Sequence, residues 1–278
     1  MHVWALLWMA CASRPDREAT PPVVVAPVSA QDDDSRGGCR IPVGTHPVTI
    51  EVAGQDRTAL VRRGADAGDA APVLFVWHGF GASARSILPA VSAETHWDDA
   101  VVIAPQGLDR TFDKFGPVAR PGWQVSLGDL EDRDLQFFDA LLDHARPCVD
   151  SSRVYSTGFS NGGFFSNVLG CHRRDTLAAI APVGGGGPFV SCQGAMPVMV
   201  THGTADRTVA YEMAVNTVQA WSKPNRCSGP IPQSDGCTGL DCETPTALCV
   251  FDGGHTWPRG TDAAIAAFLR SHVRESAE

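Results

Sequence analysis

Short stretches of almost uniformly apolar residues recur along the chain, and glycine, proline or polar residues bound each of them. Runs of this kind are typical of strands that are buried on both faces of a parallel sheet. The stretches that fit best are 72–77, 100–105, 178–183, 197–202 and 248–251. They predict the strands of a mostly parallel sheet.

The segments between these runs predict the other elements. Residues 46–52 and 57–62 indicate an opening antiparallel pair, and residues 262–272 a closing helix. Asp129 is expected to cap a helix with one apolar face, and residues 106–127 to form a long loop. The apolar face would consist of Leu135, Phe138, Leu142 and Ala145. Alternating strands and helices predict an α/β fold with helices on both faces of the sheet.

The first 38 residues differ in character from the rest. A short apolar run, 3–10, ends at Ala10-Cys11, as in a secretory segment with a lipoprotein-type cleavage site, where Cys11 would be lipidated. Residues 12–38 are rich in Pro, Ala, Asp and Ser, which predicts a disordered tether. We therefore expect an export segment over 1–11, a tether over 12–38 and one folded domain over 39–278. The protein would be extracellular or held at the cell envelope.

Composition and charge narrow the choice of partner. The chain has 278 residues, of which 44% are hydrophobic and 19% charged, which suffices for a large core. Its formal net charge of −9 disfavours nucleic acid and anionic membranes, because no basic patch exists to release counterions. No segment after the first apolar run is long and apolar enough to span a membrane. We expect a monomer.

The cysteines indicate an oxidising compartment. Eight of the nine lie in the body of the chain, an even number that is consistent with up to four disulfide bonds. Buried free thiols are the alternative; zinc is disfavoured because no C-x-x-C pair is present. Many pairings are possible, and we expect Cys227–Cys249 with Cys237–Cys242 inside it. The others are Cys39, Cys148, Cys171 and Cys192.

The most informative motif is Gly158-Phe159-Ser160-Asn161-Gly162. A β-prone stretch, 153–156, precedes it, and a helical apolar pattern, 164–169, follows it. Strand, glycine-flanked serine and helix predict a nucleophile elbow, in which a tight turn strains the serine backbone and exposes its hydroxyl. Side chains two positions before and after the serine would collide, so glycines occupy both positions. The alternative is a glycine-rich turn that contains a serine by chance.

Two later loops supply the partners that a serine nucleophile needs. Asp206 follows the stretch 197–202 and His255 follows 248–251, so Ser160, Asp206 and His255 stand in the chain order of α/β-hydrolases. His255 would accept the hydroxyl proton, and Asp206 would orient the imidazole. Two alternatives stay open. His255 could be a surface-loop histidine, and Asp235 or Asp241 could be the acid.

Further residues have expected roles around the serine. The backbone N–H groups of Asn161, at a helix start, and Phe80, after the stretch 72–77, would stabilise an oxyanion. Trp123 and Trp257 are candidates for the aromatic walls of an acyl site, with core packing as the alternative for each. Two other histidines end strands and are expected to make structural hydrogen bonds. They are His78 and His202.

Six motifs together resemble the poly(3-hydroxybutyrate) depolymerase and feruloyl esterase family of secreted α/β-hydrolases, over residues 41–272. They are His78-Gly79-Phe80-Gly81, Pro105-Gln106-Gly107, Gly122-Trp123, Gly158-Phe159-Ser160-Asn161-Gly162-Gly163, His202-Gly203-Thr204-Ala205-Asp206 and Gly254-His255-Thr256-Trp257-Pro258. The resemblance implies an α/β-hydrolase fold without a large cap domain. It assigns the triad to Ser160, Asp206 and His255, and the oxyanion amides to Phe80 and Asn161. Many relatives carry cysteine at position 80, but only its amide is needed.

Residues and resemblance together predict a secreted serine esterase that acts through an acyl-enzyme, without a metal or an organic cofactor. By resemblance, the substrates would be feruloyl or acetyl esters of polysaccharides, or short-chain polyesters such as polyhydroxybutyrate. Two other classes stay open, namely a serine peptidase on the same fold and a catalytically silent binding module.

Overall fold

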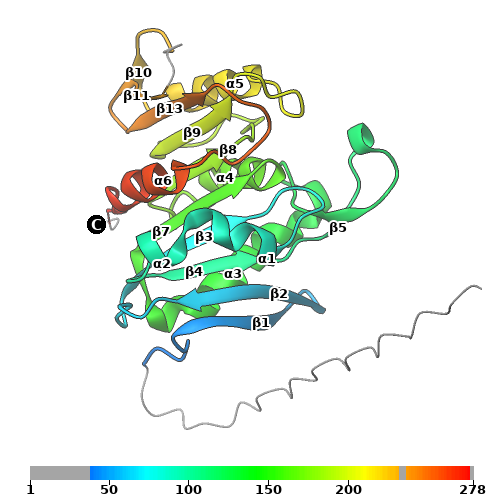
Figure 1. Cartoon of the computed structure of the whole chain (residues 1–278), viewed down its shortest axis with the longest axis vertical. Helices are drawn as coiled ribbons and strands as arrows, with labels where there is room; N and C mark the ends of the chain where they lie inside the picture. Colours follow the sequence, from blue (N-terminus) through cyan, green and yellow to red (C-terminus); the bar gives the residue numbers. More distant parts are fainter. Residues whose placement is uncertain (1–37, 232–235, 276–278) are drawn as a thin grey trace, which may run out of the picture. The chain divides into compact units, whose positions relative to one another are not determined.

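The computed structural model describes residues 38–231 and 236–275, which Figure 1 shows in colour. The expected export segment with Cys11, the expected tether up to residue 37, and Asp235 lie outside the described residues. Within these ranges, no helix has the length and apolar character needed to cross a membrane.

A nine-stranded sheet forms the centre of the described chain. In spatial order its strands are β1 (Gly44–Val52), β2 (Gln55–Arg63), β4 (Val101–Pro105), β3 (Ala71–Trp77), β7 (Val149–Phe159), β8 (Ala179–Val183), β9 (Val198–Gly203), β13 (Thr246–Phe251) and β11 (Gly236–Gly239). The run from β4 to β13 is parallel, whereas β1–β2, β2–β4 and β11–β13 are antiparallel. This confirms the expected opening pair and the mostly parallel sheet.

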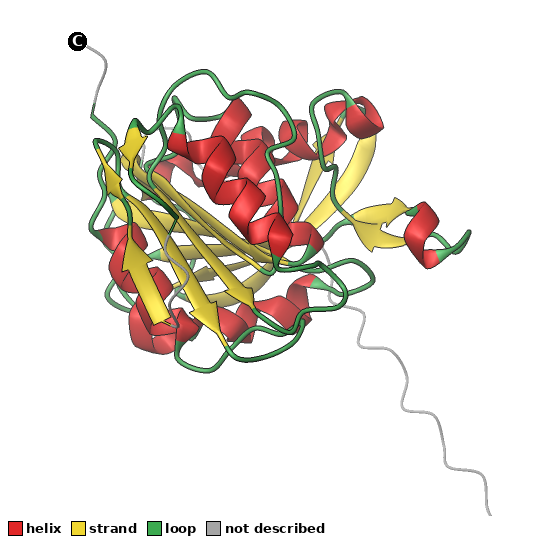
Figure 2. Ribbon diagram, turned by 90° about the horizontal axis from the view of Figure 1, so that it is seen from above, coloured by secondary structure: helices red, strands yellow, loops and turns green. Residues whose placement is uncertain are grey.

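Helices cover both faces of this sheet (Figures 1 and 2). The α-helices are α1 (Ala84–Ile87), α2 (Ala93–His96), α3 (Arg133–Ala145), α4 (Asn161–His172), α5 (Glu212–Ser222) and α6 (Thr261–Arg270). The 3₁₀ turns are η1 (Leu88–Val91), η2 (Asp113–Phe115), η3 (Asp129–Asp132) and η4 (Arg146–Cys148). Two small hairpin sheets pair β5 (Leu108–Arg110) with β6 (Arg120–Gly122), and β10 (Cys227–Ser228) with β12 (Asp241–Cys242).

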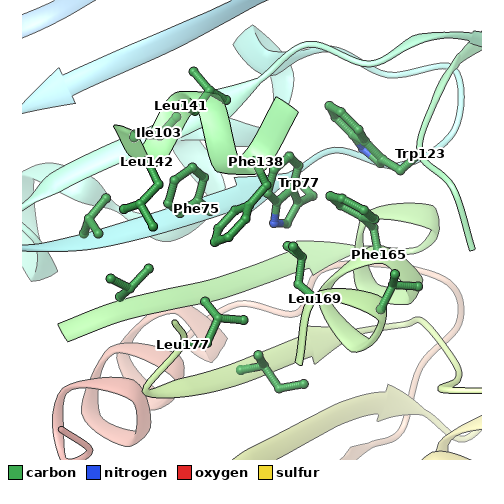
Figure 3. Close-up of a cluster of buried hydrophobic side chains, with 14 of the residues drawn as sticks. Phe75, Trp77, Ile103, Trp123, Phe138, Leu141, Leu142, Phe165, Leu169 and Leu177 are labelled. Carbon is green, nitrogen blue, oxygen red and sulfur yellow. The ribbon is translucent and has the colours of Figure 1, made fainter. Parts of the chain in front are cut away.

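The alternation of side chains along β3 explains why the hydrophobic core has two layers, one on each face of the sheet. Every residue of this strand is buried, and successive side chains point to opposite faces. Phe75 and Trp77 belong to the core layer that includes side chains of α3, α4 and α5, and Figure 3 shows them against Phe138 and Phe165. Leu74 belongs to the other layer, with side chains of α1, α2 and α6. Each large buried side chain contributes about 1.5–3 kcal/mol to folding.

Two expectations for the segment after β4 are wrong. Residues 106–127 are not a plain loop, because β5, η2 and β6 form a hairpin, called the arm below (residues 108–122), which projects from the sheet (Figures 1 and 2). Asp129 does not cap α3, which begins at Arg133. Its carboxylate instead accepts from Arg110 Nη1 at 2.8 Å and Val125 N–H at 2.9 Å, and so ties the arm to the following loop.

Four disulfide bonds join the eight cysteines that the structure describes, which fits a protein of an oxidising, extracellular compartment. The expected pairs Cys227–Cys249 and Cys237–Cys242 are wrong. Antiparallel pairing places Cys237 of β11 opposite Cys249 of β13, and Cys227 of β10 opposite Cys242 of β12. The bonds follow this register. They are Cys39–Cys148, Cys171–Cys192, Cys227–Cys242 and Cys237–Cys249.

Candidate active site

Ser160 lies in the tight turn between β7 and α4. Its backbone has φ 53° and ψ −117°, and a positive φ of this kind costs free energy for a residue other than glycine. The glycines on either side make the turn sterically possible. A Cβ at Gly158 would lie 2.6 Å from the carbonyl carbon of Gly162, and a Cβ at Gly162 would lie 2.1 Å from the carbonyl oxygen of Trp77.

Three side chains that are distant in sequence meet at this turn. Ser160 Oγ lies 2.8 Å from His255 Nε2, and His255 Nδ1 lies 2.6 Å from Asp206 Oδ2. The loops that carry Asp206 and His255 follow the parallel strands β9 and β13. An alcohol, an imidazole and a carboxylate in series can pass a proton from the hydroxyl to the imidazole while the carboxylate holds the imidazole in place.

The Asp206 carboxylate is held from several sides. Its side chain is only 1% exposed, and its Oδ1 accepts the backbone N–H groups of Thr208 at 2.8 Å and Val209 at 2.9 Å. Burial raises the pKa of Asp206, but the hydrogen bonds from His255, Val209 and Thr208 outweigh it and bring the pKa below its usual value. Asp206 is therefore an anion throughout the neutral range.

The positions of Asp241 and His255 bear on the alternatives left open around these residues. Asp241 bonds to Ser228 Oγ at 2.6 Å in the β10–β12 hairpin, whereas Asp206 contacts His255. His255 is not a free surface-loop histidine, because both ring nitrogens have partners and its side chain is 17% exposed. Its ring also packs against Phe159, with 4.8 Å between the centroids.

His78 and His202, the two histidines expected at strand ends, make structural hydrogen bonds within the core. His78 Nε2 accepts the Gly107 N–H at 3.0 Å, so its Nδ1 carries the proton and donates to Gly79 O at 2.8 Å. Burial lowers the pKa of His78 to about 4, against a smaller opposing effect of the bond to Gly79. His202 Nε2 donates to Val209 O at 2.8 Å, and burial lowers its pKa.

Both candidate oxyanion residues lie beside Ser160. Phe80 and Asn161 line the same pocket as the serine, and Asn161 is the first residue of α4, where the backbone N–H has no partner within the helix. The loop that carries Phe80 passes close to the serine, since a Cβ at Gly79 would be 3.4 Å from Ser160 Cβ. Phe80 is therefore held on a loop close to Ser160, and Asn161 follows Ser160 directly as the first residue of α4.

The pocket above Ser160 has a volume of about 430 Å³, and its walls are mainly apolar. Five phenylalanines line it, and Lys114 is its one basic residue within the described chain. The phenylalanines come from four segments, which are the loop after β3, the arm, α4 and the loop after β8. They are Phe80, Phe112, Phe115, Phe164 and Phe189.

The two tryptophans proposed as acyl-site walls do not line this pocket. Trp123 is fully buried, and its ring centroid lies 5.0 Å from that of Trp77 and 5.8 Å from that of Phe165. Figure 3 shows the three side chains in the same cluster. Trp257 is partly buried and packs against the core layer of α6. For both residues, this packing fits the alternative of a role in the core.

Sequence reasoning missed the arm as a source of pocket residues. Phe112 and Phe115 occur in a segment otherwise rich in polar residues, and large apolar side chains in such a loop are a usable signal of a binding surface. Phe115 stacks on Phe80 at 5.3 Å, and Phe112 meets Phe80 edge-on at 5.0 Å.

Comparison with known proteins was made by sequence and by structure. No family model matches the chain. A probable feruloyl esterase C of Aspergillus niger is 27% identical over 237 residues, which cover 78% of this chain and 82% of that protein. Feruloyl esterase B of Piromyces equi is 28% identical over 227 residues, which cover 66% of this chain and 39% of that protein.

Solved structures of esterases superpose on the chain. A carboxylesterase of Bacillus cereus has a TM-score of 0.59 at 17% identity, covering 77% of this chain and 94% of its own. An acetyl xylan esterase from Aspergillus awamori has a TM-score of 0.57 at 13% identity, covering 80% of this chain and 98% of its own. These likenesses show the α/β-hydrolase fold.

The chain is a carboxylic-ester hydrolase with the α/β-hydrolase fold. In sequence it is similar to feruloyl esterases, which confirms the resemblance expected from the motifs. Of the three functional classes left open by the sequence, the comparisons support the ester hydrolase.

Proposed function

We propose that the protein hydrolyses esters through a covalent acyl-enzyme on Ser160, with His255 as general base and acid and Asp206 as its orienting carboxylate. The observation that carries this proposal is the continuous series of short contacts from Ser160 Oγ to His255 at 2.8 Å and from His255 to Asp206 at 2.6 Å. A hydroxyl is a weak nucleophile near neutral pH, and an adjacent imidazole is the usual means of activating it.

In the acylation step, His255 Nε2 takes the hydroxyl proton while Ser160 Oγ forms a bond to the ester carbonyl carbon. The carbonyl oxygen becomes an oxyanion, to which the N–H groups of Phe80 and Asn161 donate. His255 then protonates the ester oxygen of the leaving alcohol, and the bond from that oxygen to the carbonyl carbon breaks. Water repeats the sequence on the acyl-enzyme, which releases the acid and restores Ser160.

For the acyl group we favour a planar aromatic acid of the feruloyl type. The pocket supports this choice because its walls carry five phenylalanines, which suit the face and edge of an aromatic ring. The sequence relatives named as feruloyl esterases point the same way. Acetyl and hydroxybutyryl esters are the competing acyl groups.

The proposal has two separate tests. Ser160→Ala should reduce hydrolysis of p-nitrophenyl acetate by at least about 10³-fold, and a fluorophosphonate should label the wild type but not this variant. Wild-type turnover by Ser160→Ala would overturn the triad. Side-by-side kcat/KM values on methyl ferulate, acetylated xylan and polyhydroxybutyrate test the acyl group. A higher value on either of the latter two would overturn the feruloyl choice and leave the triad intact.

We also propose that the protein is exported, with Cys11 as a lipid anchor at the cell envelope. The disulfide bonds support export, since such bonds persist in oxidising compartments. Cys11 lies outside the described residues. Membrane fractionation of wild type and Cys11→Ser tests the anchor, which is refuted if both variants fractionate alike.

A further inference from the structure

The base of the arm contacts both parts of the candidate oxyanion hole. Residues 121–123, called the bridge below, run between the loop that carries Phe80 and the start of α4. On the side of Phe80, the Gly81 N–H donates to Pro121 O at 2.8 Å, and the indole N–H of Trp123 donates to His78 O at 2.9 Å. The bridge therefore holds the Phe80 loop on both sides of Phe80.

On the other side, the bridge holds the side chain of Asn161. The Trp123 N–H donates to Asn161 Oδ1 at 2.7 Å, and Asn161 Nδ2 donates to Trp123 O at 3.0 Å. Both residues are buried, so water does not compete for these bonds. Two parallel amide bonds fix the rotation of the Asn161 side chain, and with it the first residue of α4.

Gly122 shows how closely the bridge packs between the two parts. A Cβ at this position would lie 2.9 Å from Asn161 Oδ1 and 3.1 Å from the ring of Phe80. Only a glycine leaves room for both neighbours. Trp123 itself is immobilised by its ring contacts with Trp77 and Phe165 in the core.

The spacing of two oxyanion donors matters because each must lie about 2.7–3.1 Å from the oxygen that becomes charged. The Phe80 amide belongs to the loop after β3 and the Asn161 amide to the first residue of α4, so their spacing depends on what joins these two segments. We propose that the bridge sets this spacing, with Trp123 as the positioning residue that links the two amides. This inference rests on the proposed function, because it assumes that both amides serve the reaction of Ser160.

The test compares two buried tryptophans in the full chain. Trp123→Phe removes the bond to His78 O; Trp221→Phe is the matched control, because Trp221 is also fully buried and its indole donates one bond, to Asn167 Oδ1 at 2.9 Å. Both changes should lower the melting temperature similarly. Only Trp123→Phe should lower kcat on p-nitrophenyl acetate, by about 10- to 100-fold, a fraction of the loss of an entire donor. KM and the pH dependence of kcat should stay unchanged.

A trifluoromethyl ketone that forms a hemiketal oxyanion with Ser160 gives a second measure. Its inhibition constant should rise in Trp123→Phe by about the same factor as kcat falls, because the oxyanion and the transition state use the same donors. In Trp221→Phe both quantities should stay within about twofold of the wild type. Equal kcat losses in the two tryptophan variants would overturn the inference.

Asn161→Leu supplies an independent variant if Trp123→Phe does not fold, since it keeps the Asn161 N–H and removes both side-chain bonds to the bridge. It should lower kcat at unchanged KM. The double variant should lose little more than the larger single loss, because both changes release the same linkage. Unchanged kcat in Asn161→Leu, or full additivity, would refute the bridge. Loss of activity in Ser160→Ala would still stand in that case, so the two proposals fail separately.

Discussion

Two of the walls of the pocket above Ser160 are built in different ways. One wall belongs to the start of α4, most of whose residues are buried against the sheet. The other wall belongs to the arm, whose strands pair with each other in a separate two-stranded sheet and whose η2 turn has no buried residue. The tip of the arm is tied to the loop after β9 through Lys114 Nζ, which donates to Thr208 O.

This difference separates chemistry from selectivity. Groups that must hold a fixed geometry, Ser160 and the first amide of α4, stand on rigid elements. The arm presents Phe112 and Phe115 from an exposed segment, where changes cost little stability. Changes on the α4 side should therefore affect all ester substrates alike, whereas changes at the tip of the arm, at Phe112 or Phe115, should alter the ranking of substrates.

The largest effect is expected for Asp206→Asn. The asparagine oxygen can still accept from Thr208 and Val209, so the loop should fold. Its amide would donate to His255 Nδ1 and place the imidazole proton on Nε2, which then cannot accept the Ser160 proton. We expect kcat to fall about 10⁴-fold on p-nitrophenyl acetate and on methyl ferulate equally. A loss under tenfold, with a normal melting temperature, would argue against Asp206 as the orienting acid.

Gly162→Ala tests the wall at the start of α4 through its effect on the free energy of unfolding. Its Cβ would lie 2.1 Å from the backbone oxygen of Trp77, which cannot move without shifting β3. We expect a loss of about 3–4 kcal/mol in the free energy of unfolding, measured by urea titration. Gly68→Ala is the control, because a Cβ there meets nothing within 4 Å, and it should change stability by less than about 0.5 kcal/mol. Similar losses of stability in both variants would contradict the claim that the turn at Ser160 has no room for a side chain at position 162.

The elbow, the start of α4 and the parallel strands that carry them were also the part of the fold that the sequence predicted best. The elbow follows from a local steric rule, because the turn has room only for glycine two positions before and two positions after Ser160, at Gly158 and Gly162. The strands β3, β4, β8 and β9 follow from apolar runs that only a doubly covered sheet can bury. Each of these inferences uses neighbours in the sequence and needs no knowledge of distant contacts.

A third prediction concerns pH and the buried His78, which lies beneath the Phe80 loop. Burial lowers the pKa of His78 to about 4. Between pH 6.5 and 4 the unfolded chain therefore binds a proton at this residue that the folded chain does not. Its contribution to stability is complete above pH 6.5 and declines as the pH falls toward 4, by up to about 3 kcal/mol.

Urea titrations of wild type and His78→Asn across this pH range measure the effect. The free energy of unfolding of the wild type should fall more steeply than that of the variant, which has no imidazole to titrate at this position. Parallel curves would show that His78 is not held neutral by burial.

The arm and its base were beyond sequence reasoning for a physical reason. β5 and β6 have only three residues each, too few to produce a periodic pattern. A tryptophan in a loop can face either a substrate or the core, and Trp123 faces the core because Trp77 and Phe165 happen to meet there. The pairing of Cys237 with Cys249 likewise depends on a strand register that the spacing of cysteines does not contain.

The smallest effect is expected on the arm, for Phe115→Ala. The side chain is 49% exposed and stacks on Phe80, so its loss should cost under about 1 kcal/mol of stability but remove one aromatic wall. We expect kcat/KM to fall about tenfold on methyl ferulate and less than about threefold on p-nitrophenyl acetate, whose acetyl group is too small to span the pocket. The decrease in the ratio of the two values is the quantity that separates the arm from the α4 side.

Val118→Ala is the matched control for this last prediction. Val118 lies on the same arm and is 57% exposed, but it does not line the pocket. Its replacement should leave both kcat/KM values unchanged. If Phe115→Ala lowered kcat/KM equally for the two substrates, the tip of the arm would also contribute to catalysis, and the division of the pocket into a chemical wall and a selective wall would be wrong. If Val118→Ala reproduced the shift in ratio, the effect would come from the arm as a whole and not from contact with the acyl group.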